Sequence, residues 1–445
     1  MSPEAARKLR RVLIVSPHFP PVNAPDHQRV RMSLPYLEEF GWRPHLLTVD
    51  PEKVEAAKDN FMREVLPAEI SLKSTNAFSP ALTRRVGLGD LGIRAYVHLK
   101  RGGEQILKTK QIDLIYFSTT VFNVFALARG WRKQFGVPYV LDFQDPWLSD
   151  YYDQPNGKTP PGGWTKYRAS QFLAKRLEPF SLRKASHVTS VSSGYVDVLK
   201  DRYPWLRSEQ FTVLPFGASE HDFELLKRMK IRQPIFQPEA GKRHWVYVGR
   251  GGADLSFAMR AFLQALKQAR ENTPETFADL TIHFIGTDYA VPDRARKTVE
   301  PLAVELGVAD LVHEQTTRIP YFEALQCLLD ADAILTFGSD DSSYTASKIY
   351  PCILANKPLL AIFHERSSVV EVLRKTNCGS VVTFNANSTI DEVSDQVSKT
   401  FFSDQSTVST GVDWNEFEKY TAREMTRRLC AIFDNCIDGH ADSTN

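Results

Sequence analysis

The sequence predicts an α/β protein made of two doubly wound, Rossmann-like domains with parallel sheets. Its 445 residues exceed what a single hydrophobic core usually serves, so two domains of roughly 200 residues are expected. Short apolar segments alternate with amphipathic helical segments in both halves, as βαβ units require. Residues 217–242 separate the halves and are polar without a clear period. We therefore expect an N-terminal domain at 1–216, a linker at 217–242 and a second domain at 243–412.

The composition narrows the class of protein. Hydrophobic residues make up 42% and charged residues 24% of the chain, which is ordinary for a soluble globular enzyme. The 55 basic and 53 acidic residues nearly cancel, so no global field attracts nucleic acid. The five cysteines are odd in number and lack paired metal-binding spacing, apart from one Cys-x5-Cys, which indicates reduced thiols in the cytoplasm. No apolar run approaches the ~18 to 20 residues of a membrane span, and we expect no signal peptide.

The N-terminal segments open with a βαβ unit. Residues 11–22 predict a buried strand that runs into a proline-rich loop, and the helix after it begins near Asp26. Residues 44–49 predict the next strand. Residues 51–110 mix charge, glycine and isolated apolar positions, so we expect two or three helices there, one of them near 92–110.

Two carboxylates follow the end of a predicted strand. Strands are expected at 112–119 and 138–147 with an amphipathic helix between them, and the second strand opens into a loop with Asp142 and Asp145. Ligands bind at the carboxyl ends of parallel strands, so these side chains indicate a ligand site. Alternatively, Asp145 caps the next turn while Asp142 accepts a hydrogen bond from a backbone N–H.

The rest of the chain continues the same alternation. In order, it predicts a helix at 164–184, a strand and a helix capped by Ser192 or Ser193, strands at 211–219 and 244–252, a helix from about 257, a strand at 280–288, a helix at 293–306, a strand at 311–316, a helix at 321–331, and strands at 333–338 and 380–384. A final helix at 413–437 and a polar tail at 438–445 follow.

The stretch Ser342–Phe363 predicts a polar turn, an apolar helix and a short buried strand. Hydroxyl groups and one ammonium gather where this helix begins, on Ser343, Tyr344, Thr345, Ser347 and Lys348. Together with the free backbone N–H groups of a first helical turn, they suit a phosphate group. The alternative is a well-capped first turn in solvent.

The turn GRGGAD at 249–254 follows a predicted strand but has only part of the glycine fingerprint of dinucleotide-binding sites. Its guanidinium, on Arg250, can bind a diphosphate through two parallel hydrogen bonds. Alternatively, Arg250 forms a salt bridge with an acid across the cleft. At the helix start near 316–323, Tyr321 is a candidate for packing against a base, although a tyrosine at such a position belongs to the core more often.

Seven motifs occur along the chain in a fixed order: SPHFPPVNAPDHQR, VLDFQDPW, VYVGRGG, FIG, RIPYFEAL, LDADAILTF and SKIYPCILANKPLLAIF. This order resembles GT-B glycosyltransferases of the large retaining group that uses nucleotide sugars, the family 4-like (group 1) enzymes, from residue 11 to about 435. The resemblance implies two Rossmann-like domains facing across a cleft, with the C-terminal helix returning to the first domain. It also implies that the second domain binds the nucleotide sugar and the first binds the acceptor, without a metal or other cofactor.

The resemblance assigns roles to individual residues. Arg250 and Lys348 look like the cations on the diphosphate, and Asp145 falls in the catalytic loop. The other donor-binding candidates are Gly249, Gly251, Tyr344, Thr345, Ser347, Ile319 and Tyr321. The candidates for the loop that approaches the phosphate or the acceptor are Asn23, Ala24, His27 and Arg29. His18 or His27 is an alternative to Asp145 for orienting the acceptor.

The chain departs from the family pattern at several positions. Ser343 and Pro351 stand where many relatives carry two glutamates, Leu255 where a second cation often follows the arginine, Asn23-Ala24 where Gly-Gly is usual, and Gln144 where a histidine is expected. These departures leave the identity of the donor open. Lys348 can replace the missing cation, because one ammonium near the diphosphate partly neutralises its charge.

The expected activity is that of a retaining hexosyltransferase. It would move a sugar from a nucleoside diphosphate sugar to a glycan or lipid-linked glycan, in surface polysaccharide or glycolipid assembly. We expect a cytoplasmic protein at the inner face of the plasma membrane that binds no nucleic acid. Three alternatives stay open: a non-catalytic GT-B scaffold subunit, a nucleotide-sugar epimerase, and a nicotinamide-dependent dehydrogenase, which the incomplete glycine fingerprint disfavours.

Overall fold

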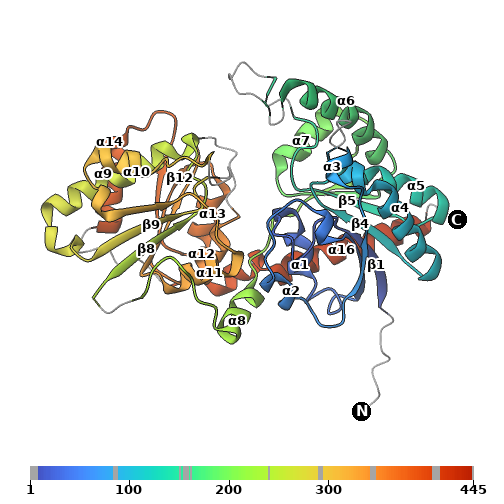
Figure 1. The fold of residues 1–445 in the computed structure, drawn as a ribbon, viewed down its shortest axis with the longest axis horizontal. Helices are drawn as coiled ribbons and strands as arrows, with labels where there is room; N and C mark the ends of the chain where they lie inside the picture. Colours follow the sequence, from blue (N-terminus) through green and yellow to red (C-terminus); the bar gives the residue numbers. More distant parts are fainter. Residues whose placement is uncertain are drawn as a thin grey trace, which may run out of the picture. The chain divides into compact units, whose positions relative to one another are not determined.

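The computed structural model describes residues 9–83, 89–149, 152–153, 160, 163–238, 241–288, 294–340, 347–402 and 411–442. The chain folds into two compact units (Figure 1). The first unit comprises residues 1–217 and 422–445, and the second comprises residues 218–421. The chain therefore leaves the first unit once and returns to it with its last helix.

The sheet of the first unit has seven parallel strands in the order β3-β2-β1-β4-β5-β6-β7. The strands are β1 (Arg10–Val15), β2 (Trp42–Val49), β3 (Ser71–Thr75), β4 (Leu114–Ser118), β5 (Tyr139–Phe143), β6 (His187–Ser190) and β7 (Phe211–Val213). The order runs outward from β1 on one side and from β4 on the other, as in Rossmann folds. The predicted doubly wound sheet is confirmed.

Apolar side chains cover both faces of this sheet. Leu13 of β1 belongs to one core cluster, together with residues of α4 (Leu91–Thr109) and α5 (Ala126–Phe135). Its neighbour Val12 belongs to the opposite cluster, together with residues of α16 (Ala422–Asp442). Successive strand residues point to opposite faces, so a run of apolar residues in β1 buries the strand on both sides.

The last helix, α16, packs against the first unit. The ring of Phe433 meets the rings of Trp42 and Tyr116 edge-on, at centroid distances of 5.2 and 5.1 Å. Oδ1 of Asp434 accepts hydrogen bonds from Nη1 of Arg10 (2.7 Å) and Nε1 of Trp42 (3.1 Å). The predicted return of the C-terminal helix to the first domain is confirmed.

Helices and short turns connect the strands of the first unit. They are η1 (Pro25–His27), α1 (Gln28–Ser33), η2 (Pro51–Lys53), α2 (Phe61–Glu64), α3 (Pro80–Thr83), η4 (Phe122–Phe125), α6 (Gly163–Leu182), α7 (Ser193–Arg202) and η5 (Ser208–Gln210), besides the helices named above. Of the two serines expected to cap α7, Ser192 is the cap, because its Oγ accepts a hydrogen bond from the backbone N–H of Gly194. The expected helix near 92–110 is α4.

The sheet of the second unit repeats this topology with six parallel strands, in the order β10-β9-β8-β11-β12-β13. The strands are β8 (Arg243–Val248), β9 (Leu280–Ile285), β10 (Val312–Gln315), β11 (Ala333–Phe337), β12 (Leu359–His364) and β13 (Ser380–Phe384). The longer helices are α8 (Glu220–Met229), α9 (Ser256–Asn272), α10 (Glu300–Leu306), α11 (Tyr321–Asp330), α12 (Ile349–Leu354), α13 (Ser368–Lys375) and α14 (Ile390–Val397).

Four segments differ from the secondary structure that the sequence predicts, and three of them lie before residue 310. β3 lies in the region 51–110, where only helices were expected; most of its residues are exposed, so it has no apolar pattern to recognise. Residues 217–242 contain α8, which belongs to the second unit. The helix expected at 293–306 is α10, which starts only at Glu300.

The single helix expected at 413–437 is interrupted at Thr421, whose backbone is extended. The N–H of Ala218 donates to the carbonyl of Tyr420 (2.7 Å), and Ala218 and Thr421 pair as a parallel bridge. This pairing holds the backbone out of the helix where the chain leaves the second unit. α16 starts immediately afterwards and reaches into the tail expected at 438–445.

The described part of the chain contains no helix that is both long and apolar enough to span a membrane. All five cysteines are buried and none forms a disulfide with another. Within the described ranges, no group of three or more His, Cys, Asp or Glu side chains is placed to hold a metal ion.

Candidate functional site

Both sheets reverse their strand order between two central strands, at β1 and β4 in the first unit and at β8 and β11 in the second. In open α/β sheets, ligands bind at such reversals, beyond the carboxyl ends of the strands. Each unit therefore has its own candidate site.

In the second unit, the turn after β8 passes close to Lys348. The N–H of Gly249 donates to the carbonyl of Ile285 (2.9 Å), which ties this turn to the end of β9. A β-carbon on Gly249 would stand 3.2 Å from Nζ of Lys348 and 2.7 Å from the hydroxyl of Tyr247. The absence of a side chain at Gly249 thus makes room for the ammonium beside the backbone of the turn. The structure brings together Gly249 and Lys348, which are far apart in the sequence.

Arg318 is a third cation at this edge. It follows β10 and lies against Gly286, where a β-carbon would stand 3.5 Å from Cγ of Arg318. Partial removal from water, followed by the charges of Arg318 and Arg250, lowers the pKa of Lys348 to about 8. Of these three cations, only Arg250 and Lys348 are predicted from the sequence. The signal that could have found Arg318 is a cation between the end of a strand and the start of a helix, the position that Arg250 also has.

Arg250 forms an ion pair within its own turn. Its Nη1 and Nη2 donate to the two carboxylate oxygens of Asp254, at 2.6 and 2.5 Å. These hydrogen bonds hold the pKa of Asp254 below its usual value. Arg250 thus forms a salt bridge, as the alternative interpretation of the sequence expected, but with an acid of its own turn. Both side chains are partly exposed, and a pair of this kind contributes only about 0 to 1 kcal/mol, so a diphosphate can compete for the guanidinium.

The other donor-site candidates occupy different environments. Tyr344 and Thr345 lie outside the described residues. Ser347 is exposed and directly precedes Lys348, whereas Ile319 is half-buried. Tyr321 starts α11, and its hydroxyl donates to Oδ2 of Asp222 in α8 (2.9 Å). We interpret Tyr321 as a residue that anchors α8 on α11.

Three further positions of the second unit have structural roles: Gly251, Leu255 and Pro351. The N–H of Gly251 donates to the carbonyl of Thr287 (2.7 Å), which joins the turn after β8 to the chain after β9. Leu255, where the family resemblance predicts a second cation, is fully buried in the core. Pro351 lies in the first turn of α12, where a helix does not need its N–H.

In the first unit, the loop after β1 carries a paired histidine and aspartate. Nδ1 of His18 lies 3.0 Å from each carboxylate oxygen of Asp26, which is 1% exposed. Oγ1 of Thr119 (2.7 Å) and the N–H of Thr120 (3.1 Å) also donate to this carboxylate. Burial acts to raise the pKa of Asp26, but the hydrogen bond and charge of His18 outweigh it, and the pKa falls to about 2. An ionised carboxylate only accepts, so Nδ1 of His18 donates to Asp26, and Nε2 is the ring nitrogen that does not take part in this pair.

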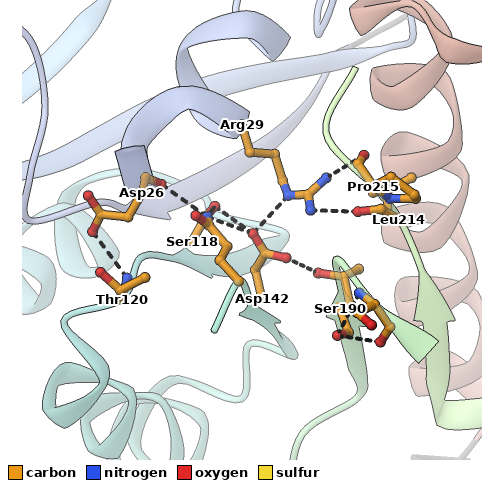
Figure 2. Close-up of polar contacts among 11 residues, drawn as sticks. Asp26, Arg29, Ser118, Thr120, Asp142, Ser190, Leu214 and Pro215 are labelled. Carbon is orange, nitrogen blue, oxygen red and sulfur yellow. Dashed lines mark hydrogen bonds and ion pairs between the residues drawn. The ribbon is translucent and has the colours of Figure 1, made fainter. Parts of the chain in front are cut away.

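Asp142 stands at the centre of a buried network (Figure 2). Its Oδ2 accepts hydrogen bonds from Nε of Arg29 (2.8 Å), Oγ of Ser118 (2.8 Å) and Nε2 of Gln144 (2.9 Å). Its Oδ1 accepts one from Oγ1 of Thr189 (2.8 Å). A fully buried carboxylate with four donors holds the strand ends together, so of the two predicted carboxylates Asp142 belongs to the scaffold.

Arg29 is engaged inside the first unit. Besides Asp142, its guanidinium donates to the carbonyls of Leu214 (2.6 Å) and Pro215 (3.3 Å), as Figure 2 shows. It also lies 4.9 Å from the ring centroid of Phe216. The side chain is fully buried. We therefore assign Arg29 a positioning role, tying α1 to the segment that follows β7.

Asp145 is exposed, unlike Asp142. Crowding by neighbouring protein atoms withdraws its carboxyl partly from water and raises its pKa. Gln144, where the family resemblance predicts a histidine, donates from Nε2 to the backbone carbonyl of Asp26 (3.0 Å) as well as to Asp142. Gln144 thus links the two buried networks and leaves Asp145 as the carboxylate that reaches the surface of this loop.

Most of the remaining candidates in the loop after β1 are buried in the first unit. His27 is fully buried, and its Nε2 donates to the carbonyl of Val22 (2.8 Å). Burial, followed by the charge of Arg31, lowers the pKa of His27 to about 4, so the ring is neutral near pH 7. Ala24 is 7% exposed, whereas Asn23 is half-buried. Of the predicted loop residues, Asn23 is thus the one that reaches the surface.

Residues 27–217 match the family model of the glycosyl transferase 4-like domain. Over this range the chain is similar to the glycosyl transferase 4-like domain. The domain ends where the first segment of the first unit ends, and it contains Arg29, Asp142 and Asp145. His18 lies ahead of the matched range. A search of curated proteins finds no significant match.

Solved structures with a glycosyl transferase fold cover nearly the whole chain. A glycosyltransferase from Rickettsia africae is 13% identical, with 96% of this chain and 99% of that chain covered and a TM-score of 0.56. Anabaena Alr3699/HepE in complex with UDP and glucose is 14% identical, with coverage of 96% and 100% and a TM-score of 0.56. A UDP-forming α,α-trehalose-phosphate synthase from Burkholderia xenovorans is 12% identical, with coverage of 96% and 99% and a TM-score of 0.57. The fold is GT-B, as predicted.

Proposed function

We propose that this protein is a glycosyltransferase that moves a hexose from a nucleoside diphosphate sugar to a hydroxyl acceptor with retention of configuration. The observation that carries the proposal is the group of three cations, Arg250, Arg318 and Lys348, at the carboxyl edge of the second sheet. The glycosyl transferase 4-like domain in the first unit supports sugar transfer as the reaction class.

The three cations suit a diphosphate. Their mutual repulsion is relieved when an anion binds between them, and Lys348, with a pKa of about 8, takes up or keeps its proton in that event. Arg250 can exchange the carboxylate of Asp254 for phosphate oxygens of similar geometry. The similar solved structures include complexes with UDP and with UDP-glucose, so a UDP-hexose is the first donor to test.

The transfer needs no nucleophilic side chain. The bond between C1 of the sugar and the diphosphate oxygen breaks, and the electron pair stays on the diphosphate. Arg250, Arg318 and Lys348 stabilise the negative charge that develops there. The acceptor oxygen bonds to C1 on the same face, and its proton passes to the departing phosphate oxygen, which accounts for retention.

We assign the acceptor to the first unit. Nε2 of His18 can form a hydrogen bond with an acceptor hydroxyl, because Nδ1 is held by the carboxylate of Asp26. Asp145 offers an exposed carboxylate for a second hydroxyl. These two groups orient the acceptor in our proposal, with surface polysaccharide or glycolipid assembly on the cytoplasmic side as its setting.

A thermal-shift screen of the full-length protein against UDP, GDP, ADP and their sugars tests the donor site. A ligand that binds only the folded protein at 100 times its Kd stabilises it by about 2.7 kcal/mol, and we expect this for one nucleoside diphosphate family. Product analysis by NMR then follows the anomeric configuration, and we expect that of the donor. Folded protein without a shift for any of these nucleotides contradicts the donor site.

Two other functions make different predictions in the same assays. A non-catalytic scaffold subunit, which the residues Ser343 and Pro351 in place of two glutamates favour, would bind a donor without turning it over. A nucleotide-sugar epimerase would release an epimerised sugar in the absence of any acceptor.

A further inference from the structure

The outer face of α6 combines aromatic rings with cations. Trp164, Arg168, Phe172, Arg176 and Phe180 follow one another at intervals of four residues. This spacing places them along one slowly winding stripe of the helix. The three rings are 44%, 63% and 39% exposed, and both arginines are exposed. Apolar and positive groups thus alternate in solvent along the helix labelled α6 in Figure 1.

No exposed acid of α6 offsets these cations. The helix and the two residues after it carry four more exposed cations: Lys166, Lys175, Arg183 and Lys184. The single acid of this stretch, Glu178, is buried and accepts a hydrogen bond from Arg202 (2.7 Å). The net charge of the whole chain is only +2, so the accumulation of cations here is a local property of the surface.

Cations also accompany the exposed rings at close range. The guanidinium of Arg176 lies 5.2 Å from the ring centroid of Phe172, and that of Arg129 in α5 lies 4.6 Å from the centroid of Phe180. Each of these rings is presented with a positive charge beside it. In the headgroup region of a bilayer, rings enter the acyl boundary while cations stay at the phosphate level.

We propose that this stripe of α6 docks on an anionic phospholipid surface. The cations meet the lipid phosphates, and Trp164, Phe172 and Phe180 enter the boundary between headgroups and acyl chains. A second copy of the chain is a poorer occupant, because pairing the same face brings cations against cations. Single-stranded nucleic acid is bound in positively charged grooves, whereas this stripe runs along the outer side of a helix. The proposal rests on the first unit alone and does not depend on sugar transfer.

Co-sedimentation of the full-length protein with vesicles tests the proposal. We expect binding to vesicles of phosphatidylcholine that contain a third phosphatidylglycerol, and little binding to phosphatidylcholine alone. Raising the salt from about 0.1 M to about 1 M shortens the Debye length from about 10 Å to about 3 Å and should weaken the binding at least tenfold. Equal binding to both vesicle types, or no binding to either, overturns the proposal.

Two pairs of variants separate the stripe from the rest of the surface. Phe172→Glu and the double variant Arg168→Glu/Arg176→Glu should each lower binding to the anionic vesicles at least tenfold. Their controls in the second unit, Val304→Glu and Lys227→Glu/Arg228→Glu, change equally exposed positions and should bind as the wild type does.

Wild-type vesicle binding by the α6 variants contradicts the proposal, as does displacement of the protein from vesicles by a single-stranded oligonucleotide. The UDP thermal shift of the α6 variants should stay unchanged, so this result is independent of the donor site.

Discussion

Nζ of Lys348 lies 3.2 Å from the point where a β-carbon on Gly249 would stand. The hydroxyl of Tyr247 is closer still to that point, at 2.7 Å. The absence of a side chain in the turn after β8 therefore positions an ammonium that the sequence places almost a hundred residues later, and it sets where an anion can approach the second sheet.

Gly249→Ala should weaken the binding of a nucleoside diphosphate about tenfold, or about 1.4 kcal/mol, because the methyl group displaces Lys348 and Tyr247. Gly249 has no positive φ that an alanine would strain, so any loss of Tm comes from the displaced ring of Tyr247, which is buried in the core. Calorimetric titration measures the affinity. Gly130→Ala is the matched control, because nothing lies within 4 Å of its β-carbon. Unchanged affinity in Gly249→Ala would argue against an anion beside this turn.

Nucleotide affinity should depend on pH through Lys348. Its pKa is about 8 in the ligand-free protein, so the ammonium loses its proton as the pH rises above 8. A bound diphosphate favours the protonated form, so binding takes up a proton and the affinity falls by up to about tenfold per pH unit above 8. Below pH 8 this group contributes no slope. Titrations across this range measure the effect.

Two lysine variants and a stability measurement check the assignment. Lys348→Met should bind weakly at every pH and lose the slope, whereas Lys357→Met, beyond the other end of α12, should keep it. The free energy of unfolding should move the other way, rising with pH from about 8 to the ordinary 10.5, because the unfolded chain keeps this proton longer. A slope that persists in Lys348→Met assigns the pH dependence to another group.

Arg29→Met should destabilise the protein by about 3 to 5 kcal/mol, because it leaves the carboxylate of Asp142 buried without its charged partner. Chemical denaturation of the first unit measures this loss. Arg423→Met removes an exposed ion pair with Glu39 and should cost no more than about 1 kcal/mol. If Arg29→Met were as stable as the wild type but failed to bind an acceptor, Arg29 would be a ligand-binding residue.

Asp145→Asn should lower the rate of sugar transfer by about 100-fold or more while leaving UDP binding and Tm unchanged, because this carboxylate is exposed and orients the acceptor in our proposal. Steady-state kinetics with saturating donor measures the rate. Asp201→Asn, an exposed carboxylate of α7, should be fully active. Full activity of Asp145→Asn would move the acceptor contact to His18 alone.

Much of the fold could be predicted from local patterns. The apolar strands of both sheets and the helix α4 follow from periodicity, and the return of α16 is what the resemblance to GT-B enzymes implies. β3 could not be predicted, because most residues of this edge strand are exposed and form no apolar pattern. The interruption of the C-terminal helix at Thr421 could not be predicted either. It depends on a backbone pairing with Ala218, which lies about two hundred residues away in the sequence.

The sequence predicts the alternation of strands and helices, the two doubly wound sheets, and the cations Arg250 and Lys348 as donor-site candidates. Which charged side chains are enclosed and which are exposed depends on the packing of segments that are distant in the sequence. Asp142 and Asp145 are three residues apart and look alike in the sequence, yet Arg29 closes over the first and the second stays exposed. Arg318 and Lys348 come from different segments of the chain, and the folded structure places their charges close enough to affect each other. The local periodicity of the sequence indicates whether a residue is buried. The partner of a charged side chain depends on contacts between distant segments, which the local pattern does not specify.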